Sequence, residues 1–175
     1  MKIFIPKDTS AVALDADDVA RALSRAQHTL EAEICRNGSR GAFWLEPLIE
    51  VELAAGRYAF GPIGVEDVPE LLECLPDRLE DHPKYLGLTE DIPWLKNQER
   101  VTFARAGLGD PVCMHTFRNL LGFSGLEKSA TLTPQEIVNQ VLESGLRGRG
   151  GAAFPTGIKW QTVLDTASDQ KYIVC

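Results

Sequence analysis

Residues 145–159 read Gly-Leu-Arg-Gly-Arg-Gly-Gly-Ala-Ala-Phe-Pro-Thr-Gly-Ile-Lys and carry more information than any other stretch of the chain. Five of the fifteen glycines lie here, together with Arg147, Arg149 and Lys159. Glycine lets a backbone come close to a ligand, and the three cations favour an anionic one. Residues from Thr156 onward read as a helix start, whose free N–H groups and positive dipole end attract phosphate. The stretch therefore predicts a phosphate-binding loop; the alternative is a surface loop that needs glycine only for its turns.

Two common phosphate motifs do not explain this loop. The phosphate loop of nucleotide triphosphatases needs lysine directly after its last glycine, whereas Ile158 intervenes here. The dinucleotide fingerprint G-x-G-x-x-G/A is matched at Gly148, Gly150 and Ala153, but it requires a strand immediately before it. Residues 133–144 predict a helix instead, so an ordinary dinucleotide-binding turn is disfavoured.

The predicted helix over 133–144 has a clear N-terminal signal. Thr133 and Glu136 form a capping-box pattern, and Pro134 suits the first helical position. Apolar residues follow at helical spacing, namely Ile137, Val138, Val141 and Leu142. The loop is therefore expected to connect two helices.

Residues 144–160 as a whole resemble the FMN-binding loop of flavin subunits that oxidise or reduce NAD. That family includes the NADH-oxidising subunit of respiratory complex I, the diaphorases of bidirectional hydrogenases, and the beta subunit of soluble NAD-dependent formate dehydrogenase. Residues 100–175 are similar to the family's opening, and residues 171–175 resemble its next strand. One departure is Ala153, where most relatives carry glycine. If that position has φ > 0, alanine costs on the order of 1 kcal/mol.

The resemblance implies a role for six residues of the loop. Gly148, Gly150 and Gly151 would let the backbone contact FMN closely, and Arg149 would add positive potential. Lys159 would hold FMN through a charge-assisted hydrogen bond. The ring of Phe154 would stack near the nicotinamide or adenine of NAD. Taken singly, Phe154 also suits core packing and Arg149 a solvated turn.

The same resemblance implies what lies outside this sequence. After the strand at residues 171–175 the family continues Asn-Ala-Asp-Glu-Gly, and later cysteines hold a [4Fe–4S] cluster. We therefore expect the chain to cover only the beginning of the flavin domain, to be inactive alone, and to have its [4Fe–4S] cluster beyond residue 175. Because the flavin carries the chemistry, no catalytic acid or base is assigned.

Cysteine and histidine spacing predicts no metal site in this segment. The cysteines are Cys35, Cys74, Cys113 and Cys175, with gaps of 39, 39 and 62 residues by subtraction. Iron–sulfur and zinc sites usually use closely spaced pairs, so isolated thiols in a reducing compartment are expected. The three histidines are equally scattered, at His28, His82 and His115.

The first part of the chain predicts a small thioredoxin-like domain over residues 1–76. Strand and helix signals alternate, and Leu48–Leu53 alternates apolar with acidic residues as a half-buried strand does. The predicted elements are a strand at 1–6, a helix at 15–30, strands at 33–36, 48–53 and 57–60 with a turn at Gly56, and a helix at 65–75. The order βαβ followed by ββα indicates an α/β fold of the thioredoxin-like type.

This order agrees with the resemblance, because hydrogenase and formate dehydrogenase relatives carry a thioredoxin-like module before the flavin domain. The free-standing relative, a small complex I subunit, binds a [2Fe–2S] cluster through four cysteines. Residues 36–47, near the expected cluster loop, contain no cysteine. The module is therefore expected to lack iron–sulfur ligands and to serve in docking. Residues 37–47 and 58–62 most resemble the formate dehydrogenase beta subunit.

Residues 77–99 are predicted to be a linker, because prolines and charges are dense there. Residues 100–175 then form the start of an α/β FMN- and NAD-binding domain. Charge divides along the same line. Residues 1–100 hold 11 Lys and Arg against 19 Asp and Glu, a balance of −8, whereas the remainder holds 7 against 6. The acidic front disfavours nucleic-acid binding.

These observations predict a cytoplasmic flavin subunit, since neither a signal peptide nor a membrane-spanning stretch is recognised. The resemblance implies an NAD-dependent formate dehydrogenase, in which a partner alpha subunit with a molybdenum cofactor oxidises formate, and a small [2Fe–2S] gamma subunit is a further partner. Iron–sulfur clusters would pass electrons to FMN and then, as hydride, to NAD⁺. The alternatives are a diaphorase subunit of a hydrogenase or of complex I, and a non-catalytic docking fragment.

Overall fold

The computed structural model describes residues 1–174, with the side chains of residues 27–30 left out. Two compact units divide the chain, the first from Met1 to Leu120 and the second from Leu121 onward. The predicted isolated thiol of Cys175 and the side chains of His28 and Leu30 lie outside the described residues. No helix among the described residues is both long and apolar enough to cross a membrane.

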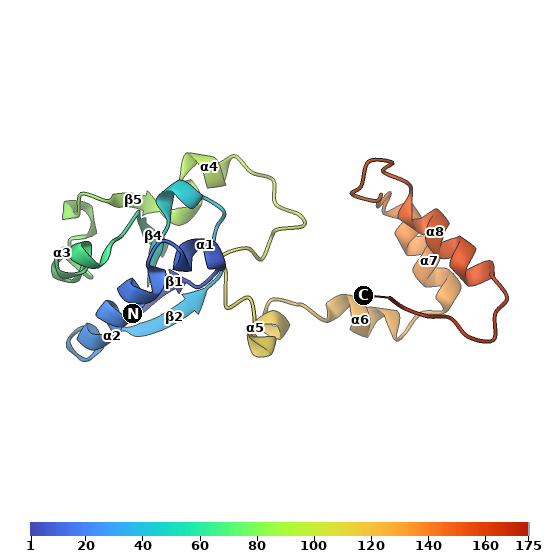
Figure 1. Cartoon of the computed structure of the whole chain (residues 1–175), viewed down its shortest axis with the longest axis horizontal. Helices are drawn as coiled ribbons and strands as arrows, with labels where there is room; N and C mark the ends of the chain where they lie inside the picture. The colour runs from blue at the N-terminus through green and yellow to red at the C-terminus, as the bar shows by residue number, and fades with distance from the viewer. Residues whose placement is uncertain (175) are drawn as a thin grey trace. The chain divides into compact units, whose positions relative to one another are not determined.

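The first unit is built on a five-stranded mixed sheet with the strand order β2-β1-β3-β4-β5. β1 and β2 are parallel, and α2 connects them; every other pairing is antiparallel. The strands are β1 Lys2–Pro6, β2 Glu33–Asn37, β3 Ile49–Leu53, β4 Gly56–Phe60 and β5 Tyr85–Leu88. The helices are α1 Thr9–Val12, α2 Ala16–Leu30, α3 Val68–Cys74, α4 Pro93–Lys96 and α5 Met114–Asn119, with short 3₁₀ turns at Phe43–Leu45, Val65–Asp67, Leu79–Asp81 and Thr89–Asp91 (Figure 1).

The first four strands with α2 and α3 form the predicted thioredoxin-like arrangement. βαβ is followed by ββα, and β3 runs antiparallel to both of its neighbours. The structure also gives α1 and α5, which the sequence pattern did not predict. The predicted helix over 65–75 is divided into a 3₁₀ turn and α3.

The two faces of the sheet differ in chemistry. One face carries Ile3, Val51 and Phe60, all fully buried in a cluster with residues of α2 and α3. The register places Phe4, Glu50 and Ala59 side by side on the other face. Near β4 this second face is apolar, and Ala59 packs in a smaller cluster whose other buried members are Leu48, Ile92 and Leu95. It is polar around Glu50 and Arg57, which form an ion pair.

Two expectations about this unit need correction. Residues 77–99, predicted as a linker, contain β5, which pairs with β4. A strand is tolerated there because Pro83 and Pro93 lie outside Tyr85–Leu88. The prediction of a half-buried β3 was wrong for Glu50, which is 1% exposed because two arginines cover it.

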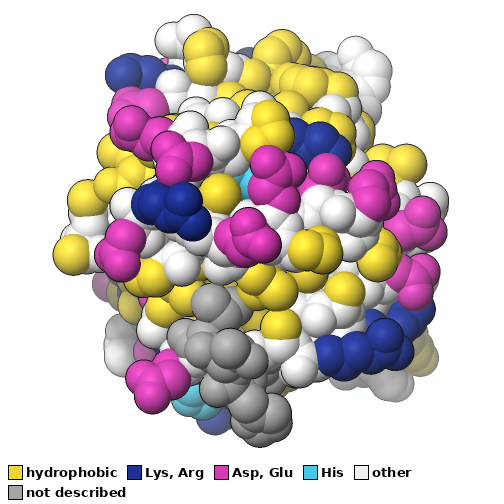
Figure 2. Space-filling model, turned by 90° about the vertical axis from the view of Figure 1, so that its left-hand side faces the viewer, with side chains coloured by type: hydrophobic (Ala, Val, Ile, Leu, Met, Phe, Trp, Pro, Cys, Tyr) yellow, Lys and Arg dark blue, Asp and Glu magenta, His cyan; other side chains and the backbone are white. Residues whose placement is uncertain are grey.

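The surface of the first unit reflects its acidic composition. The face seen in Figure 2 carries Asp and Glu side chains scattered over much of its area, with fewer Lys and Arg. Such a distribution is typical of a solvated face, and it carries no assignment of a partner by itself.

The second unit consists of helices joined by the glycine-rich loop. They are α6 Ser124–Ser129, α7 Pro134–Glu143 and α8 Thr156–Asp165, and α7 and α8 lie side by side (Figure 1). Residues 171–174, predicted as strand, have no regular secondary structure. A strand needs a hydrogen-bonded neighbour, and none pairs with them among the described residues.

Candidate functional site: the glycine-rich loop between two helices

The helix that leads into the loop begins as the sequence predicts. The N–H of Thr133 donates to Glu136 Oε2 at 2.7 Å, and the N–H of Glu136 donates to Thr133 Oγ1 at 3.3 Å. The hydrogen bonds from the backbone and side chain of Thr133 hold the pKa of Glu136 below its ordinary value. Pro134 occupies the first turn. The capping box is therefore confirmed, and α7 has a defined start.

The loop itself is closed at its base by backbone hydrogen bonds. Gly145, with a φ of +65°, follows the C-cap of α7 and turns the chain. The N–H of Thr156 then donates to the carbonyl of Leu146 at 2.9 Å, and the N–H of Gly148 donates to the carbonyl of Phe154 at 2.9 Å. Residues 148–154 thus form a small loop whose two ends are tied together.

Within this loop Arg147 braces the backbone. Its Nε donates to the carbonyl of Ala153 at 2.8 Å, and the N–H of Ala153 donates to the carbonyl of Gly150 at 3.2 Å. Ala153 has a φ of +44°, in the left-handed region that favours glycine. Ala153 therefore has the positive φ at which alanine is less favourable than glycine. The role of Arg147 as a brace was not anticipated, because no local pattern marks it.

The middle of the loop is open. Gly150 and Gly151 are exposed, and a Cβ added at either would meet no other atom within 4 Å. The outward surface of this backbone is therefore free to accept a close ligand. A cover of neighbouring side chains over Gly150 and Gly151 would have contradicted a binding role, and the structure shows none there.

The loop leads directly into the N-terminus of α8, which a glycine brings close to α7. A Cβ at Gly157 would lie 2.6 Å from Cγ of Leu142 and 2.8 Å from its Cα. Gly157 therefore serves close helix packing, a role that sequence reasoning missed. Its signal was a glycine inside a helix, where glycine costs about 1 kcal/mol relative to alanine. In the first turn of α8 the N–H of Thr156 is bonded to Leu146, so Gly157 and Ile158 carry the N–H groups that have no intrahelical acceptor, at the positive end of the helix dipole.

Two of the predicted side chains lie together at this helix start. Lys159 Nζ is 5.6 Å from the centre of the Phe154 ring, and the ring is 44% exposed. Arg149 is exposed in the same loop. The structure thus brings Gly148, Phe154 and Lys159 into one neighbourhood. Amides, an ammonium group and a helix N-terminus form a donor set suited to phosphate.

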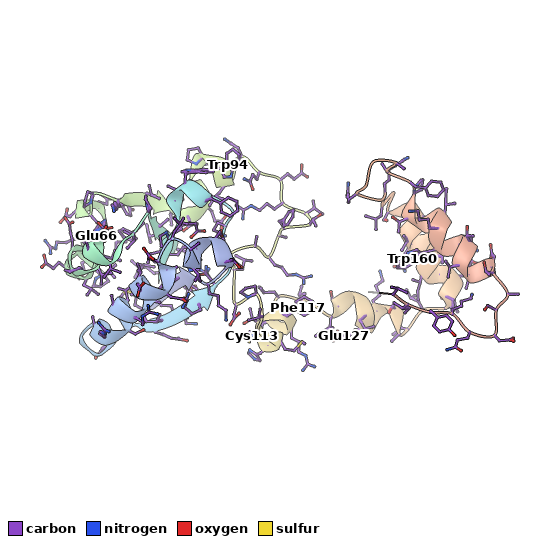
Figure 3. The ribbon with its side chains drawn as sticks, in the orientation of Figure 1. Glu66, Trp94, Cys113, Phe117, Glu127 and Trp160 are labelled. Atoms are coloured by element: carbon purple, nitrogen blue, oxygen red, sulfur yellow. The ribbon has the colours of Figure 1, made fainter. Side chains whose placement is uncertain are left out.

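The described residues fit the phosphate end of FMN better than its ring. A groove of about 530 Å³ in the second unit is lined by α6, α7 and Trp160 of α8. Its lining includes none of the six predicted site residues. Figure 3 shows Trp160 at the pair of helices α7 and α8. Exposed apolar residues at the loop itself are instead Leu146, Phe154 and Ile158.

Three curated relatives show what the chain is similar to. It is 50% identical over 80 residues to the HndC subunit of the NADP-reducing hydrogenase of Solidesulfovibrio fructosivorans, covering 46% of this chain and 16% of that protein. It is 45% identical over 67 residues to a subunit of the NADH-quinone oxidoreductase of Escherichia coli, covering 37% and 15%. It is 44% identical over 50 residues to the alpha subunit of the NAD-reducing hydrogenase HoxS of Cupriavidus necator, covering 29% and 8%.

The chain therefore spans less than a fifth of the length of these relatives, and no protein-family model matches it. Among solved structures, a Cys-to-Ser variant of the thioredoxin-like [2Fe–2S] ferredoxin of Aquifex aeolicus aligns with a TM-score of 0.37 and 19% identity, over 43% of this chain and 86% of that one. The matched part of the chain is homologous to subunits of NAD(P)-linked oxidoreductases.

Proposed function

We propose that residues 148–159 bind the phosphate of FMN in the flavin subunit of an NAD(P)-linked oxidoreductase. The observation that carries the proposal is the open backbone at Gly150 and Gly151, in the loop that leads into α8, where Lys159 lies beside the Phe154 ring. Homology to subunits of hydrogenases and of NADH-quinone oxidoreductase supports it. The proposed ligand contacts come from Gly148, Arg149, Gly150, Gly151, Phe154 and Lys159.

Each group has a distinct task in this proposal. The backbone amides of the loop donate to phosphate oxygens, and Lys159 adds a charge-assisted hydrogen bond. Arg149 raises the local positive potential. Phe154 and Ile158 offer apolar surface to an aromatic ring. FMN, when bound, would supply transfer of electrons and hydride to or from NAD(P), so the protein contributes position and electrostatics.

The relatives favour one electron source over another. Two are subunits of hydrogenases and one is a subunit of NADH-quinone oxidoreductase, as their names state. They support the diaphorase alternative better than the formate dehydrogenase reading, which rests on the resemblance of residues 37–47 and 58–62. We therefore propose a hydrogenase or NADH-dehydrogenase diaphorase first, with heteromeric partners, and formate dehydrogenase with its molybdenum subunit second. Turnover of the purified complex with hydrogen, NADH or formate separates these.

The binding proposal is tested with FMN and with riboflavin, which has the same ring and no phosphate. Purified protein is titrated with each, and flavin fluorescence reports binding. FMN should bind more tightly than riboflavin. Lys159→Ala should weaken FMN binding about tenfold or more, as loss of a charge-assisted hydrogen bond implies, and leave riboflavin unaffected. Lys2→Ala, in the first unit, is the control and should change neither.

A second variant separates binding from folding. Gly150→Ala adds a methyl where the structure has open space, so stability should be unchanged while FMN binding falls. Gly125→Ala, also in open space but in α6, should leave FMN binding unchanged. Equal binding of FMN and riboflavin, or unchanged FMN affinity in both loop variants, would contradict the proposal.

The non-catalytic docking reading keeps one observation in its favour. Trp44 and Trp94, each more than half exposed, meet edge to face with ring centres 5.2 Å apart on the first unit. Exposed aromatic pairs are common at protein interfaces. If the purified protein shows no measurable flavin binding, the non-catalytic docking function is the alternative that remains.

A further inference from the structure

The polar end of the second sheet face depends on partners from far along the chain. Asn37, 2% exposed, donates from Nδ2 to the carbonyl of Gly107 at 2.9 Å. Arg57 donates to the same carbonyl from Nη1 at 3.2 Å and to the carbonyl of Leu108 from Nη2 at 3.0 Å. Buried amides and guanidinium groups are costly without acceptors. These two carbonyls therefore complete this part of the sheet.

Two further contacts extend the same interaction along the chain. The N–H of Gly38, just after β2, donates to the carbonyl of Gly109 at 3.0 Å. Lys7 Nζ, just after β1, bonds Asp110 Oδ2 at 2.9 Å. Each residue from 107 to 110 thus bonds either to a strand residue or to the residue that follows a strand. Such continuity is unlike a loop that merely passes over a surface.

Glycine is required at the closest approach. Gly107 has a φ of +78°, and a Cβ there would overlap Cδ of Arg40. A Cβ at Gly109 would overlap Cγ2 of Thr116 in α5. The backbone of this segment therefore lies directly on neighbouring side chains.

The surface beneath Gly107 is held rigidly by ion pairs. Arg40 bonds Glu50 in a bidentate pair, with Nε to Oε1 at 2.7 Å and Nη2 to Oε2 at 2.9 Å, and bonds Glu90 at 2.8 Å. Arg57 also bonds Glu50, at 3.2 Å, and its guanidinium lies 3.5 Å from the centre of the Phe4 ring. Glu52 also lies 3.7 Å from Arg57, so three carboxylates hold the two guanidinium groups in place as a platform beneath residues 107–110.

We propose that residues 107–110 are an internal docking strap, and that the polar face of the thioredoxin-like sheet is its binding surface. This face of the sheet is occupied by the chain's own backbone at residues 107–109. The chain therefore leaves the thioredoxin-like unit from a fixed point, and a partner protein must dock elsewhere on this unit. This inference is independent of FMN binding.

Hydrogen exchange at single amides tests the strap in the full chain. The Gly38 amide, which donates to Gly109, should be protected in the wild type. Gly107→Ala should speed its exchange about tenfold or more, while amides of β3 and β4 stay protected. Gly41→Ala is the matched control, because Gly41 also has a positive φ, +81°, but its Cβ would meet nothing within 4 Å. It should leave the Gly38 amide unchanged.

Asp110→Asn provides a second variant that removes the ion pair to Lys7 from a partly exposed position. Asp110→Asn should also speed exchange at the Gly38 amide, by about threefold. If Gly107→Ala does not fold, this variant alone tests whether residues 107–110 are held on the sheet. The strap is overturned if Gly38 is unprotected in the wild type, if Gly107→Ala and Gly41→Ala act equally, or if Asp110→Asn has no effect at Gly38.

Discussion

At the scale of single residues, backbone conformation decides what each position of the loop tolerates. Ala153 holds a left-handed φ of +44° without being glycine, and Arg147 keeps it there by bonding its carbonyl. Gly145 reaches +65° at the end of α7 without this strain. Strain of this kind persists only where surrounding contacts enforce it. The loop is thus a defined structure and not merely a flexible connection.

Replacing Ala153 with glycine should therefore stabilise the chain. The substitution removes the left-handed penalty of about 1–2 kcal/mol. It also destabilises the folded state by about 0.5–1 kcal/mol, because glycine gives the unfolded chain more conformational entropy. A net gain of about 0.5–1 kcal/mol in the free energy of unfolding is expected from urea titration. Ala152→Gly is the control and should destabilise, because Ala152 has no positive φ. Equal losses in both variants would show that the strain is absent.

At the scale of elements, the second unit depends on how closely α7 and α8 approach. Val138 is 5% exposed, whereas Leu142, Ile158 and Trp160 are each more than 40% exposed. Few buried apolar groups hold this pair, so the contact at Gly157 matters more than it would in a large core. Gln135 of α7 also bonds Gln161 of α8 at 2.8 Å.

Gly157→Ala should destabilise this helix pair. Alanine favours a helix by about 1 kcal/mol over glycine, but overpacking against Leu142 costs about 1–3 kcal/mol. We expect the clash to dominate, because the added methyl would meet the backbone of Leu142 as well as its side chain. Gly125→Ala in α6 has the same propensity gain and open space, so it should stabilise. Thermal unfolding followed by far-UV circular dichroism gives the sign for each, and a gain in both would refute the packing role.

At the scale of the whole molecule, charge is organised differently inside and outside. The chain has a net charge of −7, and acidic side chains are scattered over the face seen in Figure 2. Inside the first unit, Glu50 is almost fully buried between Arg40 and Arg57 on the second sheet face. Its carboxylate is therefore a structural group, and it supports the platform under residues 107–110.

Removing this buried charge should cost far more than removing its neighbour. Glu50→Gln leaves two arginines undercompensated, and about 3 kcal/mol or more of stability should be lost. Glu52→Gln, on the same strand and 3.7 Å from the same Arg57, is 43% exposed and should cost about 1 kcal/mol or less. Urea unfolding followed by tryptophan fluorescence measures both. Similar small losses would mean that the buried network contributes little.

The sequence by itself determined the elements whose signals are local. The strands at β1 to β4, the long α2, and the capping box of Thr133 and Glu136 follow from periodicity and cap chemistry within a few residues. Glycine density and Lys159 likewise marked the candidate loop. Only the tertiary structure decided the pairing of β5, the burial of Glu50, the strap at residues 107–110 and the packing role of Gly157. Each of these depends on partners distant in sequence, and no local pattern records which distant groups will meet.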